Sequence, residues 1–198
     1  PEEVEILRAV AVGENVLKVG EDVTAGQEVI PAGIHIRAAE IGGLMALGLT
    51  SVAVASPPSV GIISTGDEVI SPDQELGPGQ VRDVNAYTLS ALVKAAGGVP
   101  VLYGIIPDQA RDLKSTAERA LLECDLVVIT AGSSASTRDL TADVINELGE
   151  PGVLVHGVNV RPGKPTILGV CQKKAIIGLP GNPVSALVIA SLFVIPVI

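Results

Sequence analysis

The chain has 198 residues, of which 47% are hydrophobic and only 2% aromatic, and its net charge at pH 7 is −9. This length suffices for one well-packed domain and a smaller piece. The scarcity of aromatic side chains and the negative charge argue against a protein that binds nucleic acid through stacking platforms or a broad basic face, although a few local cations can still hold a small anionic ligand.

Cysteine usage indicates an intracellular protein without a zinc site. Cys124 and Cys171 are the only cysteines, and no CxxC or Cys/His spacing is present, so a reduced cytoplasmic compartment is the simplest interpretation. The apolar stretch Ala186–Ile198 is shorter than the roughly 20 residues of a membrane span, which predicts a buried helix and no membrane association. The chain opens without Met and stops in this apolar stretch, so we expect it to be truncated at both ends.

Residues 1–57 are predicted to form a partial β-rich linker domain. Short apolar runs broken by Gly and Pro predict strands at Val4–Ala9, Asn15–Val19, Glu28–Ile30 and Ser51–Ala55, with one helix around Ala38–Leu47. The pair Pro57-Pro58 forms a stiff joint, and we place the domain boundary there.

Residues 58–198 alternate between strand and helix patterns. Continuous apolar strands are predicted at Val60–Ile63, Val99–Ile106, Leu126–Ile129, Val153–Val158, Thr166–Val170 and Ala175–Leu179. Helices are predicted to begin at Asn85, near Gln109 and around Thr141, and a last helix follows the final strand. Repeated βα units of this kind predict a three-layer α/β domain with a mostly parallel sheet. The final two strands, joined by residues 171–174, are predicted to form an antiparallel hairpin.

Three strands of this sheet are predicted to deliver acidic loops to one edge. They end before Thr65-Gly66-Asp67-Glu68, before Pro107-Asp108, and before the run Thr130 to Asp139. Ligands of open α/β sheets bind beyond the carboxyl ends of the strands. Hard carboxylate oxygens near a phosphate favour Mg²⁺, and Arg161 and Lys164 could neutralise the anion. The simpler alternatives are that Asp108 and Asp139 cap helices and that Glu68 is a solvated loop residue.

The turn Gly178-Leu179-Pro180-Gly181-Asn182-Pro183-Val184-Ser185 is the most informative segment. Two glycines and two prolines fix the backbone as it leaves a buried strand, and Asn182 occupies the position of a helix N-cap. Such a strand-to-helix turn presents unpaired backbone N–H groups, which favour an anion. The alternative is a tight turn with no ligand.

Five motifs appear in a fixed order along the chain. They are Ser64 to Glu68, Asp83-Val84-Asn85, Gly104 to Asp108, Arg161-Pro162-Gly163-Lys164-Pro165 and Gly178 to Ser185. Together they resemble the molybdopterin molybdenumtransferase family, whose members insert molybdate into adenylylated molybdopterin, release AMP, use Mg²⁺ and act as homodimers. The resemblance spans essentially the whole chain, and it implies a pterin nucleotide as ligand.

The resemblance assigns roles by motif. It implies that the catalytic and metal-binding residues are Glu68, Asp108 and Asp139. It implies that the cofactor-binding residues are Thr65, Gly66, Asp67, Gly132, Ser133, Ser134, Arg161, Lys164, Pro180 and Pro183. One departure is Ser136, which stands where the family has glycine.

Two other functions share this fold. A molybdopterin adenylyltransferase has the same domain and a Gly-rich loop followed by Asp, but the segment before Pro57 and the Pro-Gly-Asn-Pro turn favour the first interpretation. A non-catalytic pterin- or nucleotide-binding module is the second alternative, and the altered loop at Gly132–Thr137 is its best support.

Overall fold

The computed structural model describes residues 3–131 and 135–198. The chain divides into two compact units, Pro1–Val54 and Ala55–Ile198, and each is considered by itself. The division falls three residues before the boundary that we placed after Pro57.

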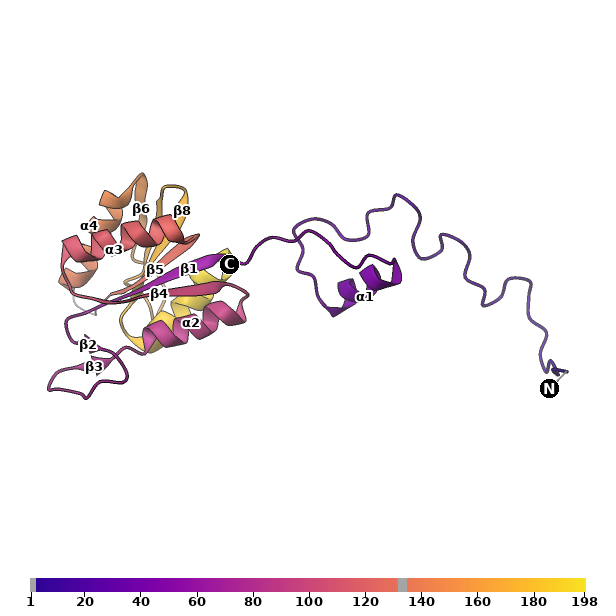
Figure 1. The fold of residues 1–198 in the computed structure, drawn as a ribbon, viewed down its shortest axis with the longest axis horizontal. Helices are drawn as coiled ribbons and strands as arrows, with labels where there is room; N and C mark the ends of the chain where they lie inside the picture. Colours follow the sequence, from indigo (N-terminus) through magenta and orange to yellow (C-terminus); the bar gives the residue numbers. More distant parts are fainter. Residues whose placement is uncertain (1–2, 132–134) are drawn as a thin grey trace. The chain divides into compact units, whose positions relative to one another are not determined.

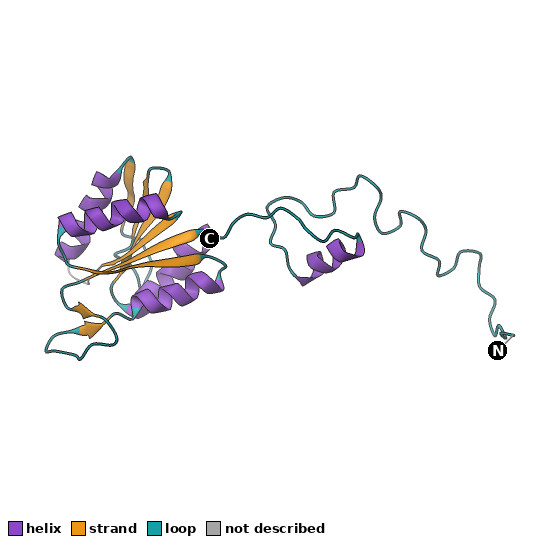
Figure 2. Cartoon of the chain, in the orientation of Figure 1, coloured by secondary structure: helices purple, strands orange, loops and turns teal. Residues whose placement is uncertain are grey.

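The first unit contains the predicted helix, α1 (Ala38–Ala46), but none of the predicted strands (Figure 2). Glu40 stabilises the start of α1, since its carboxylate accepts a bond from the Arg37 backbone N–H at 2.8 Å. The four strand predictions in residues 4–55 were wrong. A strand needs a paired neighbour and a face to bury, and the apolar side chains of Val4, Leu7 and Val19 are all exposed. The described part of this unit is therefore not β-rich.

The second unit is built on a six-stranded sheet in the order β4-β1-β5-β8-β7-β6. These strands are β1 (Ser59–Thr65), β4 (Val99–Ile106), β5 (Leu126–Ala131), β6 (Pro151–His156), β7 (Ile167–Cys171) and β8 (Lys174–Pro180). The first four in spatial order are parallel, whereas β7 is antiparallel to both β8 and β6. The prediction of a mostly parallel α/β sheet with a late antiparallel hairpin is confirmed.

Helices cover both faces of this sheet, which gives the predicted three layers (Figure 1). The helices α2 (Asn85–Ala95) and α5 (Pro183–Ile189) pack on one face, and α3 (Ala110–Glu123) and α4 (Ala135–Leu148) pack on the other. Side chains alternate between the two faces along each strand. Ile62 and Val128 therefore join the core beneath α2 and α5, while Ile63 and Ile129 join the core beneath α3 and α4.

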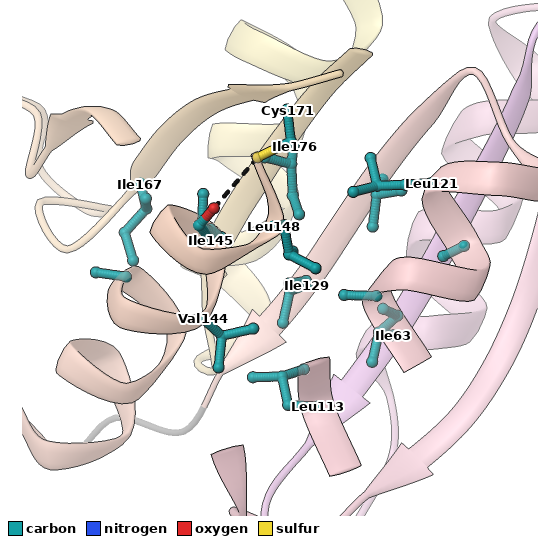
Figure 3. Close-up of a cluster of buried hydrophobic side chains, with 14 residues drawn as sticks. Ile63, Leu113, Leu121, Ile129, Val144, Ile145, Leu148, Ile167, Cys171 and Ile176 are labelled. Atoms are coloured by element: carbon teal, nitrogen blue, oxygen red, sulfur yellow. Dashed lines mark hydrogen bonds between the residues drawn. The ribbon is translucent and has the colours of Figure 1, made fainter. Parts of the chain in front are cut away.

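The core beneath α3 and α4 includes one of the two cysteines (Figure 3). The Cys171 thiol donates to the backbone oxygen of Ile145 at 3.3 Å, and burial raises the pKa of this thiol. Cys124, the C-cap residue of α3, is also free and buried. Both thiols therefore belong to the packing of the domain.

The apolar C-terminal stretch is folded against the sheet. α5 continues as a π-helical segment (Ala190–Val194) and a short 3₁₀ turn (Ile195–Val197). Ile189, Ala190 and Val194 are buried in the core beneath α2 and α5. Among the residues that the structure describes, no helix is long and apolar enough to cross a membrane.

One feature of the second unit was missed by the sequence analysis. After β1 the chain forms two short strands, β2 (Val69–Ile70) and β3 (Val81–Arg82), which pair in parallel outside the main sheet. Two-residue strands carry too little periodicity to be recognised in a sequence. They hold residues 69–82 as a projection beyond the carboxyl end of β1 (Figure 1).

Candidate functional site at the carboxyl edge of the sheet

The order of the strands defines where a ligand binds in this class of fold. From β1 the chain moves outward to β4, and then crosses to β5 on the other side of β1. The carboxyl ends of β1 and β5 therefore flank the point at which the direction of winding reverses. Ligands of open α/β sheets bind in the crevice at such a point.

A cleft of about 570 Å³ lies at this point. Its floor is formed by the strand ends, with Ser64, Thr65 and Thr130. The turn between β8 and α5 forms one wall, and the projection of residues 68–82 together with the start of α2 forms the other. The further lining residues are Glu68, Val69, Leu76, Gln80, Val81, Arg82, Asp83, Val84, Asn85, Gly181, Asn182 and Pro183.

Three polar side chains in the floor and walls of this cleft each bury an oxygen atom that has no hydrogen-bond partner among the described residues. Ser64 is 2% exposed, Thr65 4% and Asn85 9%. The atoms concerned are Ser64 Oγ, Thr65 Oγ1 and Asn85 Oδ1, for which residues 3–131 and 135–198 supply no partner. A buried polar group without a partner costs about 1–3 kcal/mol, and such groups in a native structure call for a specific explanation. A bound ligand with complementary polar groups is such an explanation.

Formal charge in the cleft is negative on balance. Among the described lining residues, Glu68 and Asp83 are acidic and Arg82 alone is basic. Arg82 already donates to the backbone oxygens of Pro72, at 3.0 Å, and Gln74, at 3.2 Å. Its guanidinium therefore braces the projection, and the cleft itself favours neutral hydrogen-bonding groups over a phosphate.

The predicted carboxylates lie at the same edge of the sheet but not all in the cleft. Glu68 lines it. Asp67 and Asp108 are neighbours, because Asp67 Oδ1 accepts a bond from the Asp108 backbone N–H at 3.2 Å, and Asp108 leads into α3. Asp139 is exposed in the second turn of α4. Within residues 3–131 and 135–198, no group of three or more His, Cys, Asp or Glu side chains could hold a metal ion.

The basic residues lie on the loop between β6 and β7. Ile167, at the start of β7, pairs with His156 at the end of β6 and with Gly178 near the end of β8. This loop therefore lies at the same edge of the sheet as the cleft. Arg161 and Lys164 are both exposed, but neither is among the residues that line the cleft.

Gly163 anchors this basic loop to the domain. Its φ is +116°, and a Cβ atom at this position would overlap Cγ1 and Cδ1 of Ile189, a fully buried residue of α5. The hydroxyl of Thr166, also buried, donates to the Gly163 backbone oxygen at 2.6 Å. Gly163 therefore fixes the position of the loop, and the side chains of Arg161 and Lys164 on either side of it face solvent.

The turn between β8 and α5 has the predicted form. Pro180 ends β8, and Pro183 is the first residue of α5. Asn182 is the N-cap, as predicted, because its Oδ1 accepts a bond from the Ser185 backbone N–H at 3.2 Å. Of the two prolines predicted to contact the ligand, Pro183 lines the cleft and Pro180 does not.

Other predicted positions fall differently. Thr65 is in the floor of the cleft, and Gly66 is buried directly behind it with φ +143°, where a Cβ atom would lie 2.7 Å from Val69 Cγ2. Gly132, Ser133 and Ser134 lie outside the described residues. No role in ligand binding was predicted from the sequence for Ser64, Asn85 or Thr130. The motif Asp83-Val84-Asn85 was the available signal for Asn85, but only the fold shows that it meets the end of β1.

A family profile described as a probable molybdopterin binding domain matches residues 61–198. The chain belongs to this family. The matched residues include every wall of the cleft and all of the predicted acidic and basic positions.

Curated relatives carry more specific names. The chain is 39% identical over 177 residues to the molybdopterin molybdenumtransferase of a Nostoc species, and the aligned residues make up 88% of this chain and 40% of that protein. It is 32% identical over 175 residues to the enzyme of the same name from Haemophilus influenzae, covering 88% of this chain and 43% of that protein. The chain thus spans less than half the length of these relatives.

Solved structures agree with this family. The molybdopterin biosynthesis MoeA protein of Pyrococcus horikosii superimposes with a TM-score of 0.76 at 40% identity, over 89% of this chain and 44% of that one. The molybdopterin biosynthesis enzyme MoaB of a Thermus species superimposes with a TM-score of 0.55 at 21% identity, over 71% of this chain and 91% of that one. The second likeness shows the fold alone.

Proposed function

We propose that this chain is part of a transferase that inserts molybdate into adenylylated molybdopterin with release of AMP, in molybdenum cofactor biosynthesis. The observation that carries the proposal is the cleft at the β1–β5 reversal, which is lined by three buried side-chain oxygens without a partner among the described residues. In a molybdopterin-binding domain, the pterin nucleotide is the ligand that suits these groups.

Glu68, Asp108 and Asp139 are the proposed catalytic and metal-binding residues. The described carboxylates form no closed cage for a resident metal, yet Asp67 and Asp108 are adjacent and Glu68 faces the cleft. Mg²⁺ commonly keeps several waters and binds through one or two carboxylates plus substrate phosphates. The residues therefore fit a magnesium ion that arrives with the nucleotide, and this ion would neutralise phosphate charge when bound.

The remaining proposed contacts surround the cleft. Thr65, Gly66 and Asp67 form the turn at the end of β1, where Gly66 allows the backbone to approach a ligand closely. Arg161 and Lys164 supply the positive charge that the cleft lacks, from the neighbouring loop at the same edge. Pro180 and Pro183 hold the turn before α5. Gly132, Ser133 and Ser134, which lie outside the described residues, are also proposed to bind the ligand.

Assembly and location are part of the same proposal. We infer that the whole protein acts in the cytoplasm as a homodimer, and that parts of it beyond these 198 residues contribute to turnover. The contribution of further parts is supported by relatives more than twice as long as the matched segment, and the homodimer and the cytoplasmic location are proposed from the family resemblance alone. Ligand binding by this chain and catalysis by the whole protein are therefore separate measurements.

AMP release tests the proposed reaction. Adenylylated molybdopterin is incubated with the protein and Mg²⁺, with and without molybdate, and AMP is quantified by chromatography. A transferase releases AMP in a molybdate-dependent manner. Formation of adenylylated molybdopterin from molybdopterin and ATP would instead identify an adenylyltransferase, and tight binding without either reaction would identify a non-catalytic module.

A further inference from the structure

We propose that Asn85 is a specificity-determining residue whose side-chain oxygen binds an amino group on the ligand's nitrogen heterocycle. This inference rests on the proposed function, because it assigns a part of that ligand to the cleft. The observation behind it is the single unpartnered acceptor that Asn85 presents in the wall of the cleft, beside the end of β1.

The orientation of the Asn85 amide is set by its neighbour. Asn85 Nδ2 donates to the Gly181 backbone oxygen at 2.8 Å, which ties the start of α2 to the turn before α5. Rotating the amide by 180° would place Oδ1 against that carbonyl, and two acceptors would then face each other. Oδ1 is therefore the atom left without a partner, and an amide oxygen can only accept hydrogen bonds.

The surroundings of Asn85 identify the class of donor. A charged ammonium donor would suit the negative lining, but the ligand of this family is a pterin nucleotide without one. The neutral donors of such a ligand include amino groups on its rings. Along β1 and β5, Ser64 and Thr130 share the sheet face of Ile62 and Val128, the face on which α2 packs. Their hydroxyls can donate to a ring nitrogen beside the amino group.

Phosphate is a poor candidate for this position. Glu68 and Asp83 line the cleft, and the guanidinium of Arg82 is engaged by two backbone oxygens. An acceptor such as Oδ1 would also repel a phosphate oxygen. We place the phosphate-bearing part of the ligand at the rim of the cleft, toward Arg161, Lys164 and the proposed magnesium site, so the heterocycle is the part that enters the cleft. Contact with the shielded Oδ1 requires a side-chain adjustment in the cleft wall, which is common on binding.

Two sources can supply the amino group, the pterin ring and the adenine base. The test therefore measures affinity for two matched pairs of probes by isothermal titration calorimetry. One pair is 6-hydroxymethylpterin and 6-hydroxymethyllumazine, in which an oxo group replaces the amino group. The other pair is AMP and purine riboside 5′-monophosphate, in which hydrogen replaces it. We expect the parent chain to prefer the amino-bearing member of one pair by about ten-fold, and that pair identifies the ring in the cleft.

Variants assign the preference to Asn85. Asn85→Leu keeps the branched shape of the side chain but removes the acceptor, together with the donor to Gly181, so it should bind both members of that pair with the weaker affinity. Asn146→Leu is the control, since it removes a different structural amide, one that accepts from the Val153 backbone N–H at 2.9 Å, and it should retain the preference. If Asn85→Leu does not fold, Asn85→Ala replaces it.

The outcomes separate this inference from the proposed function. An Asn85 variant that keeps the ten-fold preference overturns the inference, and so does a parent chain that distinguishes neither pair. Adenylylated molybdopterin is titrated in parallel. If it binds the parent and the Asn85 variant equally, the assignment of Asn85 is wrong but the proposed ligand stands, whereas failure to bind the parent contradicts the proposed function itself.

Discussion

Gly163 offers a quantitative test of how the basic loop is held against the domain. In the variant Gly163→Ala, the new methyl group would overlap the side chain of Ile189, and the residue would keep a φ of +116°. A non-glycine residue in this region costs about 1–2 kcal/mol, and overpacking a core costs about 1–3 kcal/mol. We expect the free energy of unfolding to fall by roughly 2–5 kcal/mol.

Gly157→Ala is a matched control in the same loop. Gly157 also has a positive φ, of +96°, but a Cβ atom there would meet only the Lys164 backbone oxygen at 3.5 Å, an ordinary contact distance. This variant should therefore lose only the conformational part, about 1–2 kcal/mol. The difference between the two variants in urea-induced unfolding isolates the overlap with Ile189.

A double-mutant cycle completes the test. Ile189→Ala alone removes a buried side chain and should cost about 2–5 kcal/mol. In Gly163→Ala/Ile189→Ala the overlap disappears, so the double variant should be more stable than the sum of the single losses by about 1–3 kcal/mol. Strict additivity, or a Gly163→Ala loss no larger than that of Gly157→Ala, would refute the packing described here.

Three further predictions concern charge. Arg161→Ala and Lys164→Ala should each weaken binding of adenylylated molybdopterin by about 1.5–3 kcal/mol, with no change in the urea concentration at the midpoint of unfolding. Lys94→Ala, at the far end of α2, is the control and should leave the affinity for this ligand, measured by calorimetry, unchanged. Asp139→Asn should reduce the gain in ligand affinity that Mg²⁺ provides, and an unchanged gain would remove this carboxylate from the site. Asp125 accepts two hydrogen bonds from Ser59, which lower the pKa of its carboxyl group below the usual 3.8. Asp125→Ala should therefore lower the thermal midpoint at pH 7. This difference from the parent should shrink as the pH falls through and below 3.8, because the stabilisation requires the ionised carboxylate.

The sequence predicted the α/β domain well because its periodicities are strong and local. Val99–Ile106 was predicted to its exact bounds, and the helix predicted to begin near Gln109 is α3 (Ala110–Glu123). Continuous apolar runs between helical patterns leave few alternatives to a parallel sheet. Asn182 was likewise predictable, because an N-cap depends on residues within one turn.

The errors lie where long-range contacts decide the structure. Apolar runs before Pro57 suggested strands, but strands form only with partners, and the sequence of a single segment does not specify those partners. The cleft was not predicted because residues 69–82, which contribute to one of its walls, carry almost no regular pattern in the sequence. Asn85 appeared as the start of a helix, which it is, while its bond to Gly181 spans 96 positions in the chain.

The acidic positions show what topology alone can predict. Glu68, Asp108 and Asp139 each follow the carboxyl end of a parallel strand and so lie at one edge of the sheet, whereas their part in binding stays a prediction. The topology could not show which of these residues line the cleft beside the start of α2 and which lie at the connections into α3 and α4 on the other face of the sheet. That distinction depends on which sheet face each helix covers.

Amide chemical-shift mapping can locate the pterin nucleotide that we propose binds in the cleft at the β1–β5 reversal. On titration of the ¹⁵N-labelled chain with adenylylated molybdopterin, we expect the largest shifts at Ser64 to Glu68, at Arg82 to Asn85 and at Gly181 to Asn182. Shifts concentrated at the opposite edge of the sheet, around Gln172 and Lys173 in the β7–β8 turn, with none at Thr65 or Asn85, would contradict this proposal.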